Sequence, residues 1–250
     1  MGWLLRLKNL VVVGIFVSGV IAYMSWRWVS PPKRDLPEDF HEHNAQDVHF
    51  LSVDGLCLHG KYLKGKEDNR ATIIMCHGYF RSISETWSTG ISLNSEGYNV
   101  LCLDFRASGD SAGSFTTVGY MESQDIISAV QFVKSNYGEG PIGVFGISMG
   151  ASAAIMAAAR SNDINVIVAD SPFSDLKEVM RWKIPDFLPF HKLNFLGWLC
   201  IKIGEKIAGM ELSKVRPIDC ISVVSPRPLL LIYGELDSYI PLGQGYDLYS

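Results

Sequence analysis

The sequence predicts an α/β fold: one main domain built on a mostly parallel central sheet, with helices on both faces of that sheet. The chain has 250 residues, of which 48% are hydrophobic and 19% charged, so it can bury one sizeable core. Short apolar runs alternate with segments of helical pattern over much of its length. Several of these runs are apolar throughout, which is typical of strands that are covered on both faces. In sheets of this kind, sites lie at the carboxyl ends of the strands.

An uncharged apolar segment near the N-terminus predicts a membrane helix. Residues 10–26 carry no charged side chain, and at a rise of about 1.5 Å per residue they nearly cross a hydrocarbon core of about 30 Å. Two alternatives stay open: a cleaved signal peptide, for which Val20 and Ala22 have the required spacing, and a buried core helix. We expect a single-pass anchor over residues 1–28. Basic residues flank it on both sides, so the sequence does not decide its orientation.

Prolines among charged residues predict an extended linker over residues 29–45, and the folded domain then covers residues 46–250. Strand-like runs at 46–53 and 56–63 flank an Asp-Gly pair that suits a tight hairpin. Further strands are expected at 71–76, 99–103, 142–145, 166–169 and 228–233, and helices at 85–95, 122–136 and 149–160. The aromatic-rich stretch 173–215 lacks a strand-like run, which predicts a helical cap insertion over the carboxyl edge of the sheet.

Charge and cysteine content exclude several classes of protein. The formal net charge is −4 and no block is rich in Lys or Arg, so a nucleic-acid partner is not expected. The five cysteines lie far apart and form no CxxC pair, so neither a zinc site nor a dithiol redox site is predicted. Cys76 and Cys102 lie inside apolar runs, where a free thiol behaves as a small hydrophobe.

The most specific pattern is the G-x-S-x-G pentapeptide from Gly146 to Gly150. It follows a predicted strand directly and precedes an Ala-rich helical segment. A serine on such a strained turn needs small neighbours on both sides, because larger side chains would collide with the strand and the helix. This context makes Ser148 the candidate nucleophile. The alternative is a Gly/Ser turn that matches the pattern by coincidence.

A serine hydroxyl is a weak nucleophile and needs an oxyanion hole, a general base and a group that orients the base. We expect the backbone N–H groups of Tyr79 and Met149 to form the oxyanion hole. His77 precedes the nucleophile, so we expect it to hold its own loop. The strand at 228–233 leads to Asp237, the candidate orienting acid, with Glu235 as the alternative.

Two further aspartates follow predicted strands. For Asp104 and Asp170 the sequence leaves two roles equally open: to tie down turns and helix caps, or to act in catalysis.

Taken together, these residues resemble the α/β-hydrolase superfamily, and within it the membrane-anchored and prolyl-oligopeptidase-like serine hydrolases. Five blocks in the expected order carry the resemblance, at residues 77–79, 104–113, 146–150, 170–173 and 227–241. The resemblance implies hydrolysis of ester, thioester or amide bonds through an acyl-enzyme, with no metal or organic cofactor. The expected substrate is a small-molecule or lipid acyl ester. The aromatic insertion and the membrane helix favour a lipid or acyl-protein ester over a free soluble ester, and a peptide substrate stays open.

One departure from the family pattern concerns the histidine. In the family the catalytic histidine follows the acid on a later loop, but all six histidines here precede Asp237, and only His191 lies in the insertion. We therefore expect this histidine, and a final strand and helix, beyond Ser250. Without them the sheet should expose an edge and apolar surface. The alternative interpretation is a catalytically inactive or truncated hydrolase fold that acts as a binding module.

Overall fold

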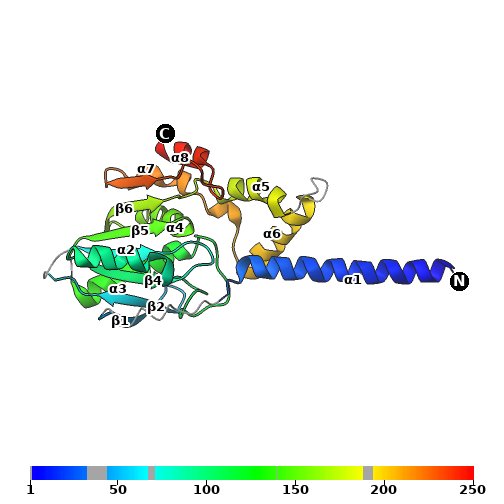
Figure 1. Ribbon diagram of the computed structural model, residues 1–250, viewed down its shortest axis with the longest axis horizontal. Coiled ribbons are helices and arrows are strands. Elements are labelled where there is room, and N and C mark those ends of the chain that lie inside the picture. Colours follow the sequence, from blue (N-terminus) through cyan, green and yellow to red (C-terminus); the bar gives the residue numbers. More distant parts are fainter. Residues whose placement is uncertain (1, 33–43, 67–70, 139, 188–193) are drawn as a thin grey trace.

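The computed structural model describes residues 2–32, 44–66, 71–138, 140–187 and 194–250. Its centre is a seven-stranded sheet with the strand order β1-β2-β4-β3-β5-β6-β7 (Figure 1). The strands are β1 (Gln46–Leu51), β2 (Cys57–Leu63), β3 (Thr72–Cys76), β4 (Asn99–Asp104), β5 (Ile142–Ile147), β6 (Ile164–Asp170) and β7 (Leu229–Ile232). The pairs β1–β2 and β2–β4 are antiparallel, and the other pairs are parallel. The predicted mostly parallel sheet is confirmed.

The hairpin at the start of the domain closes as the sequence predicts. The N–H of Ser52 donates to the carbonyl of Leu56 at 2.9 Å, and Gly55 has a φ of 82°, a conformation that glycine adopts without a steric penalty. β1 and β2 then pair in register from Gln46 opposite Tyr62 to Leu51 opposite Cys57.

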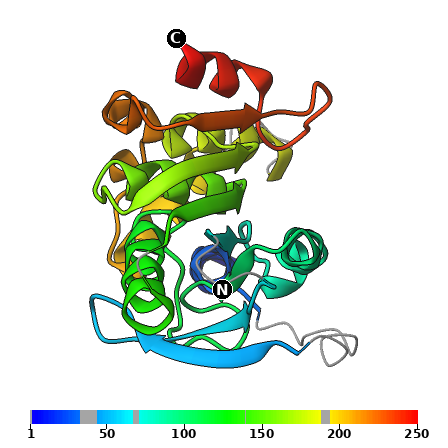
Figure 2. The ribbon, with the colours of Figure 1, turned by 90° about the vertical axis from the view of Figure 1, so that its left-hand side faces the viewer.

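Helices cover both faces of the sheet (Figure 2). On one face lies α2 (Ile83–Ser95), whose Ile83 and Trp87 pack against Met75 and Cys102. On the other face lie α3 (Glu122–Tyr137) and α4 (Met149–Ala158), which share the main core with the sheet. All ten residues of α4 are buried, so the helix that begins at the candidate nucleophile is fixed by packing along its whole length.

The N-terminal apolar segment forms one long helix, α1 (Gly2–Val29), which projects from the body of the molecule (Figure 1). Over Lys8–Val29, with a mean hydropathy of 1.8, it is long and apolar enough to cross a membrane, and a signal sequence would pass the same test. Large side chains are exposed along most of the helix. Its last turns differ, because Ser25 and Val29 are fully buried in the domain.

The insertion consists of helical segments in its described part. They are α5 (Leu176–Phe187), α6 (Asn194–Ala208) and the single-turn η3 (Leu212–Lys214), and they lie at the end of the domain from which α1 projects (Figure 1). α6 packs directly on α1. A Cβ at Gly204 would lie 2.6 Å from the ring of Trp28, so glycine is what allows this close approach.

The C-terminal part begins with η4 (Pro217–Asp219) and α7 (Ile221–Val224). The strand β7 and the helix α8 (Leu242–Tyr249) follow. β7 is the strand at one edge of the sheet. Apolar side chains on it and after it are exposed, among them Leu230, Ile232, Leu236 and Tyr239. Among the described strands, β7 is thus an edge strand with exposed apolar side chains. All five cysteines are free, and Cys76 and Cys102 are buried in strands as predicted.

Candidate active site

Ser148 occupies a sharp turn between β5 and α4. Its backbone has φ 52° and ψ −112°, and a positive φ is uncommon for a residue with a side chain. The turn is held by a 2.7 Å hydrogen bond from the Ser148 N–H to the carbonyl of Asp170 on the neighbouring strand. Strained backbone of this kind persists only where the surroundings fix it, and it is concentrated at functional sites.

Steric crowding by nearby backbone atoms requires glycine at both glycine positions of the pentapeptide. A Cβ at Gly146 would lie 2.5 Å from the backbone N of Ala151. A Cβ at Gly150 would lie 2.5 Å from the carbonyl oxygen of Cys76 and 2.6 Å from that of His77. The end of β3 therefore touches the first turn of α4, which brings the loop after β3 beside the serine.

That loop carries Tyr79. A Cβ at its neighbour Gly78 would lie 3.6 Å from the Cβ of Ser148, at van der Waals contact, so the loop lies directly beside the nucleophile. Among the described residues the Tyr79 N–H donates to no acceptor, and the N–H of Met149, in the first turn of α4, has no partner within the helix. Two free backbone donors therefore flank the serine.

His77 is buried and holds the loop, as predicted. Its Nδ1 donates to the carbonyl of Gly78 at 2.8 Å, and its Nε2 accepts the N–H of Phe105 at 3.1 Å. Burial lowers the pKa of His77, so the imidazole is neutral. The two hydrogen bonds occupy both of its ring nitrogens. The Gly78 N–H donates to the carboxylate of Glu85 at 2.6 Å, which fixes the loop from the side of α2.

Asp237 lies on the loop that follows β7. The register aligns Ile147, Asp170 and Ile232 across three parallel strands, so Ser148 and Asp237 follow strands that end at one edge of the sheet. One oxygen of Asp237, Oδ1, accepts the N–H groups of the next turn at 2.7 and 2.9 Å. The alternative acid, Glu235, is exposed. Within the described residues no hydrogen bond joins Ser148 to Asp237.

The described histidines do not reach the acid. His59 lies on β2 and bonds to Asp104 and Asp47, each at 2.9 Å, and the ring of His49 packs beside it. Asp104 also accepts the N–H of Ile83 at 2.9 Å and so caps α2, which is the structural one of the two roles that the sequence left open. The other three histidines, among them His191 of the predicted insertion, lie outside the described residues.

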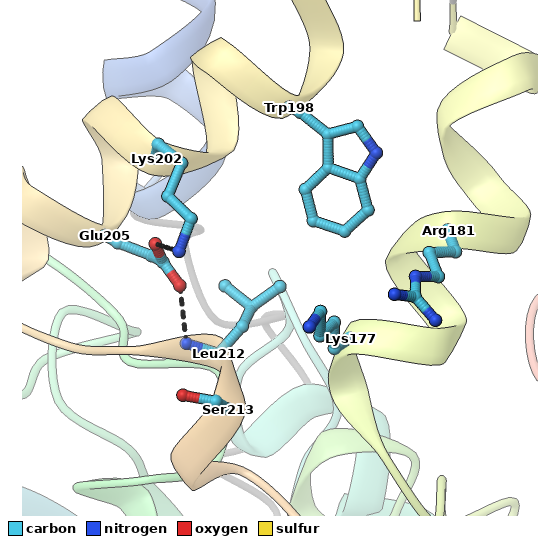
Figure 3. A pocket seen from close by; sticks show the side chains of 7 residues that line it. All are labelled: Lys177, Arg181, Trp198, Lys202, Glu205, Leu212 and Ser213. Carbon is cyan, nitrogen blue, oxygen red and sulfur yellow. Dashed lines mark hydrogen bonds and ion pairs between the residues drawn. The ribbon is translucent and has the colours of Figure 1, made fainter. Parts of the chain in front are cut away.

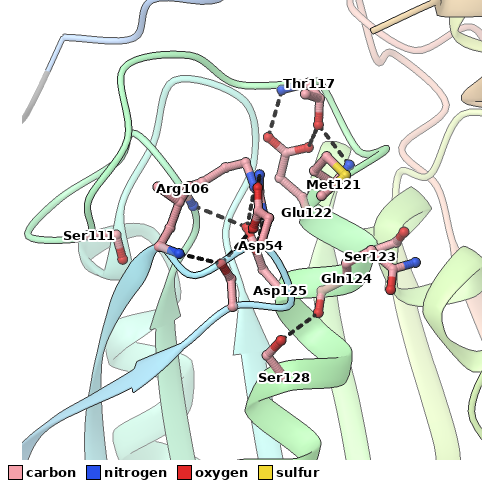
Figure 4. A network of polar contacts seen from close by, with 12 residues as sticks. Asp54, Arg106, Ser111, Thr117, Met121, Glu122, Ser123, Gln124, Asp125 and Ser128 are labelled. Carbon is pink, nitrogen blue, oxygen red and sulfur yellow. Dashed lines mark hydrogen bonds and ion pairs between the residues drawn. The ribbon is translucent and has the colours of Figure 1, made fainter. Parts of the chain in front are cut away.

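Sequence reasoning missed a buried polar network behind the site (Figure 4). Arg106, which follows β4, bonds to Asp125 of α3 at 2.6 and 2.9 Å and to Asp54 of the hairpin turn at 2.9 and 3.0 Å. Burial raises the pKa of Asp125 to about 6 despite Arg106, whereas Arg106 lowers the pKa of the more exposed Asp54 to about 2. Only the tertiary contact between these three elements reveals the network.

A second part of the network holds the loop before α3. The carboxylate of Glu122 is fully buried and accepts four hydrogen bonds of 2.6 to 2.9 Å from the hydroxyls of Thr116 and Thr117 and the N–H groups of Thr117 and Gly119. The Thr116 hydroxyl also lies 3.7 Å from the sulfur of Met149. The loop therefore packs directly beneath the first residue of α4.

A cavity of about 340 Å³ lies between α5, α6 and η3 (Figure 3). Three cationic side chains, one carboxylate and an indole ring dominate its lining, which consists of Lys177, Arg181, Trp198, Lys202, Glu205, Leu212 and Ser213. Lys202 pairs with Glu205 at 2.6 Å, and Glu205 accepts the N–H of Leu212 at 2.7 Å. Its chemistry suits an anionic group beside an apolar one. Among the described residues no three His, Cys, Asp or Glu side chains are grouped to hold a metal ion.

Comparison with known proteins identifies the class. A family model described as serine aminopeptidase, S33, matches residues 67–215, so the chain belongs to this family of the α/β-hydrolase superfamily. Among solved structures, the esterase Pf2001 of Pyrococcus furiosus is similar, with 29% identity and a TM-score of 0.72 over 89% of this chain and 83% of the esterase.

Two protein relatives extend the comparison. The uncharacterized protein YqkD of Bacillus subtilis is 29% identical over 221 residues, which cover 86% of this chain and 71% of YqkD. The lysophosphatidylserine lipase ABHD12 of Macaca fascicularis is 26% identical over 166 residues, which cover 63% of this chain and 39% of the lipase. The resemblance seen in the five sequence blocks is thus confirmed at the level of the superfamily.

Proposed function

We propose that this protein is a serine hydrolase that cleaves carboxylic ester or thioester bonds, and by the same chemistry amide bonds, through an acyl-enzyme on Ser148. The observation that carries the proposal is the strained turn at Ser148. It lies between two glycines that tolerate no side chain and beside two backbone donors without a partner among the described residues. A reactive serine needs such a turn and this proximity to N–H donors.

In the proposed reaction the Oγ of Ser148 attacks the acyl carbonyl carbon while a general base takes its proton. The carbonyl electrons move onto oxygen, and the N–H groups of Tyr79 and Met149 stabilise that oxyanion. The carbon–oxygen or carbon–sulfur bond then breaks, and the leaving alcohol or thiol takes the proton. Attack by water on the acyl-enzyme releases the acid and restores Ser148.

The general base is an imidazole oriented by Asp237. Because Oδ1 of Asp237 is held by two backbone N–H groups, Oδ2 is the oxygen available to accept from an imidazole. No described histidine contacts this carboxylate, so the imidazole that the proposal requires comes from outside the described residues.

The substrate that we propose is a lipid acyl ester with an anionic headgroup, taken by a protein anchored through α1 as a single-pass helix. The cationic cavity between α5 and α6 lies on the part of the insertion that packs against α1. The similarity to a lysophosphatidylserine lipase points in the same direction. A shorter soluble ester would not require either feature.

The test is labelling of the full chain with a fluorophosphonate probe, read by intact mass and peptide mapping. We expect one adduct, on Ser148, and no adduct in Ser148→Ala. The matched control is Ser171→Ala, since Ser171 follows the next strand and also has a positive φ, 53°. Labelling that persists in Ser148→Ala contradicts the proposal.

A second candidate function is a binding module on an inactive hydrolase fold. It is favoured by one observation, the lack of a contact between Asp237 and any described histidine. A full chain that unfolds cooperatively, binds lysophospholipid and takes up no probe would support this alternative over hydrolysis.

A further inference from the structure

The last turn of α1 enters the hydrolase domain instead of ending at its surface. Val29 is fully buried, and its carbonyl accepts the N–H of Thr116 at 2.8 Å. The carbonyl before it, of Trp28, accepts the phenol hydroxyl of Tyr79. The final carbonyls of a helix lack partners within the helix and carry partial negative charge, so they attract donors from neighbouring segments.

Both donors belong to segments that touch the proposed oxyanion hole. Tyr79 itself supplies one of the two N–H groups. Thr116 lies beneath the other, because its hydroxyl contacts the sulfur of Met149 at 3.7 Å. Two consecutive carbonyls of α1 therefore hold the two sides of one site.

The loop at Tyr79 needs such support. Phe80, the next residue, has a φ of 57°, a conformation that costs free energy in a residue with a side chain. Its ring stacks on Tyr79 with centroids 4.1 Å apart, and the guanidinium of Arg27 lies 5.5 Å from the Phe80 ring. Residues of the same helix turn thus fix the hydroxyl of one aromatic side chain and the ring of the next.

The Tyr79 hydroxyl is suited to a permanent structural bond. Burial raises the pKa of this phenol well above its usual value, so the group stays protonated and donates. The phenol points to α1, while the backbone N–H of the same residue donates to no acceptor in the described part of the chain. The side chain and the amide of Tyr79 therefore have separate tasks.

We propose that the C-terminal turn of α1 positions the oxyanion hole, with Trp28 and Val29 as positioning residues that act through Tyr79 and Thr116. The inference rests on the proposed function. On this inference, the apolar N-terminal helix supports the hydrolase site as well as acting as an anchor. A displacement of α1 relative to the domain therefore lowers the reactivity of Ser148.

The experiment compares Tyr79→Phe with the full-length parent in detergent. The substitution removes only the hydroxyl and keeps the ring and the backbone N–H. We expect the rate constant of fluorophosphonate labelling at Ser148 to fall about tenfold, a fraction of the roughly 10²- to 10³-fold loss that follows removal of an oxyanion donor. For an acyl ester substrate, kcat should fall by the same factor while KM stays within twofold.

The matched control is Tyr233→Phe. The Tyr233 hydroxyl donates to the carbonyl of Pro172 at 2.7 Å, so this variant also loses one bond from a phenol to a backbone carbonyl. Both variants should lower the melting temperature by similar amounts, but only Tyr79→Phe should slow labelling. Equal labelling rates for Tyr79→Phe and the parent overturn the inference and leave the proposed function standing.

A second measurement does not depend on activity. Hydrogen exchange over residues 77–83 should accelerate in Tyr79→Phe and stay unchanged in Tyr233→Phe. If the parent takes up no probe, the proposed function fails, and exchange alone then decides whether α1 holds this loop. Unchanged exchange over residues 77–83 overturns the positioning role.

Discussion

Gly150 offers the sharpest test of how the site is built, because an added methyl group there should push the start of α4 away from the end of β3. In Gly150→Ala the new Cβ would lie 2.5 Å from the carbonyl oxygen of Cys76 and 2.6 Å from that of His77. Both contacts are with backbone, so no side chain can rotate away. Either the start of α4 or the end of β3 has to move.

The magnitude follows from the distances. Ordinary carbon–oxygen contacts are about 3.4 Å or longer, so the gap has to widen by about 0.9 Å. Overpacking of this kind costs about 1–3 kcal/mol. In an open helix position the same change would instead stabilise by about 1 kcal/mol, because alanine is the better helix former. A misplacement of about 1 Å between nucleophile and oxyanion donors costs about 100-fold in rate.

The assay combines urea denaturation with the fluorophosphonate labelling rate. The control is Gly243→Ala in α8, where an added Cβ meets nothing within 4 Å. We expect Gly150→Ala to lose about 1–3 kcal/mol and most of its labelling rate, and Gly243→Ala to match or exceed the parent stability. A Gly150→Ala protein with the parent's denaturation midpoint and labelling rate would refute the contact-based reasoning.

Two further predictions concern buried polar groups. Glu122→Gln places an amide NH₂ among the donors of residues 116–119, so the free energy of unfolding in urea should fall by about 2–3 kcal/mol, and an unchanged midpoint would contradict this. Burial alone would lower the pKa of His59, but hydrogen bonds to Asp104 and Asp47 outweigh it and the net pKa is raised above 6.5. The stabilisation is therefore complete below pH 6.5 and is lost as the pH rises through the folded-state pKa. Stability measured from pH 6 to 9 should decline, and His59→Gln should remove that slope; a parallel slope in the variant argues against this assignment.

The elements that the sequence predicted well are those set by local pattern. The hairpin depends on an Asp-Gly pair between two strand-like runs, and the pairing follows it in register. The turn at Ser148 depends on five consecutive residues, and the two glycines among them occupy positions where a side chain would collide with backbone atoms. The role of His77 followed from its place directly after a strand and before the nucleophile, and its two hydrogen bonds agree.

Other features could not be obtained from local pattern. Lys177 and Arg181 lie on α5, and Lys202 lies on α6, so they line one cavity only because the two helices pack together. The contact of Arg106 with both Asp54 and Asp125 joins residues that are far apart in the chain. No spacing rule indicates such pairs, because the approach of their elements is decided by packing.

The N-terminal helix shows the division most clearly. The sequence by itself determined that residues 10–26 form an apolar helix, that a serine sits on a strained turn after β5, and that the chain is an α/β-hydrolase. Only the tertiary structure decided that the last carbonyls of this helix bind Tyr79 and Thr116. The physical reason is that an apolar helix face has the same composition whether lipid or protein covers it, while backbone carbonyls bond to whatever donor the fold brings to them.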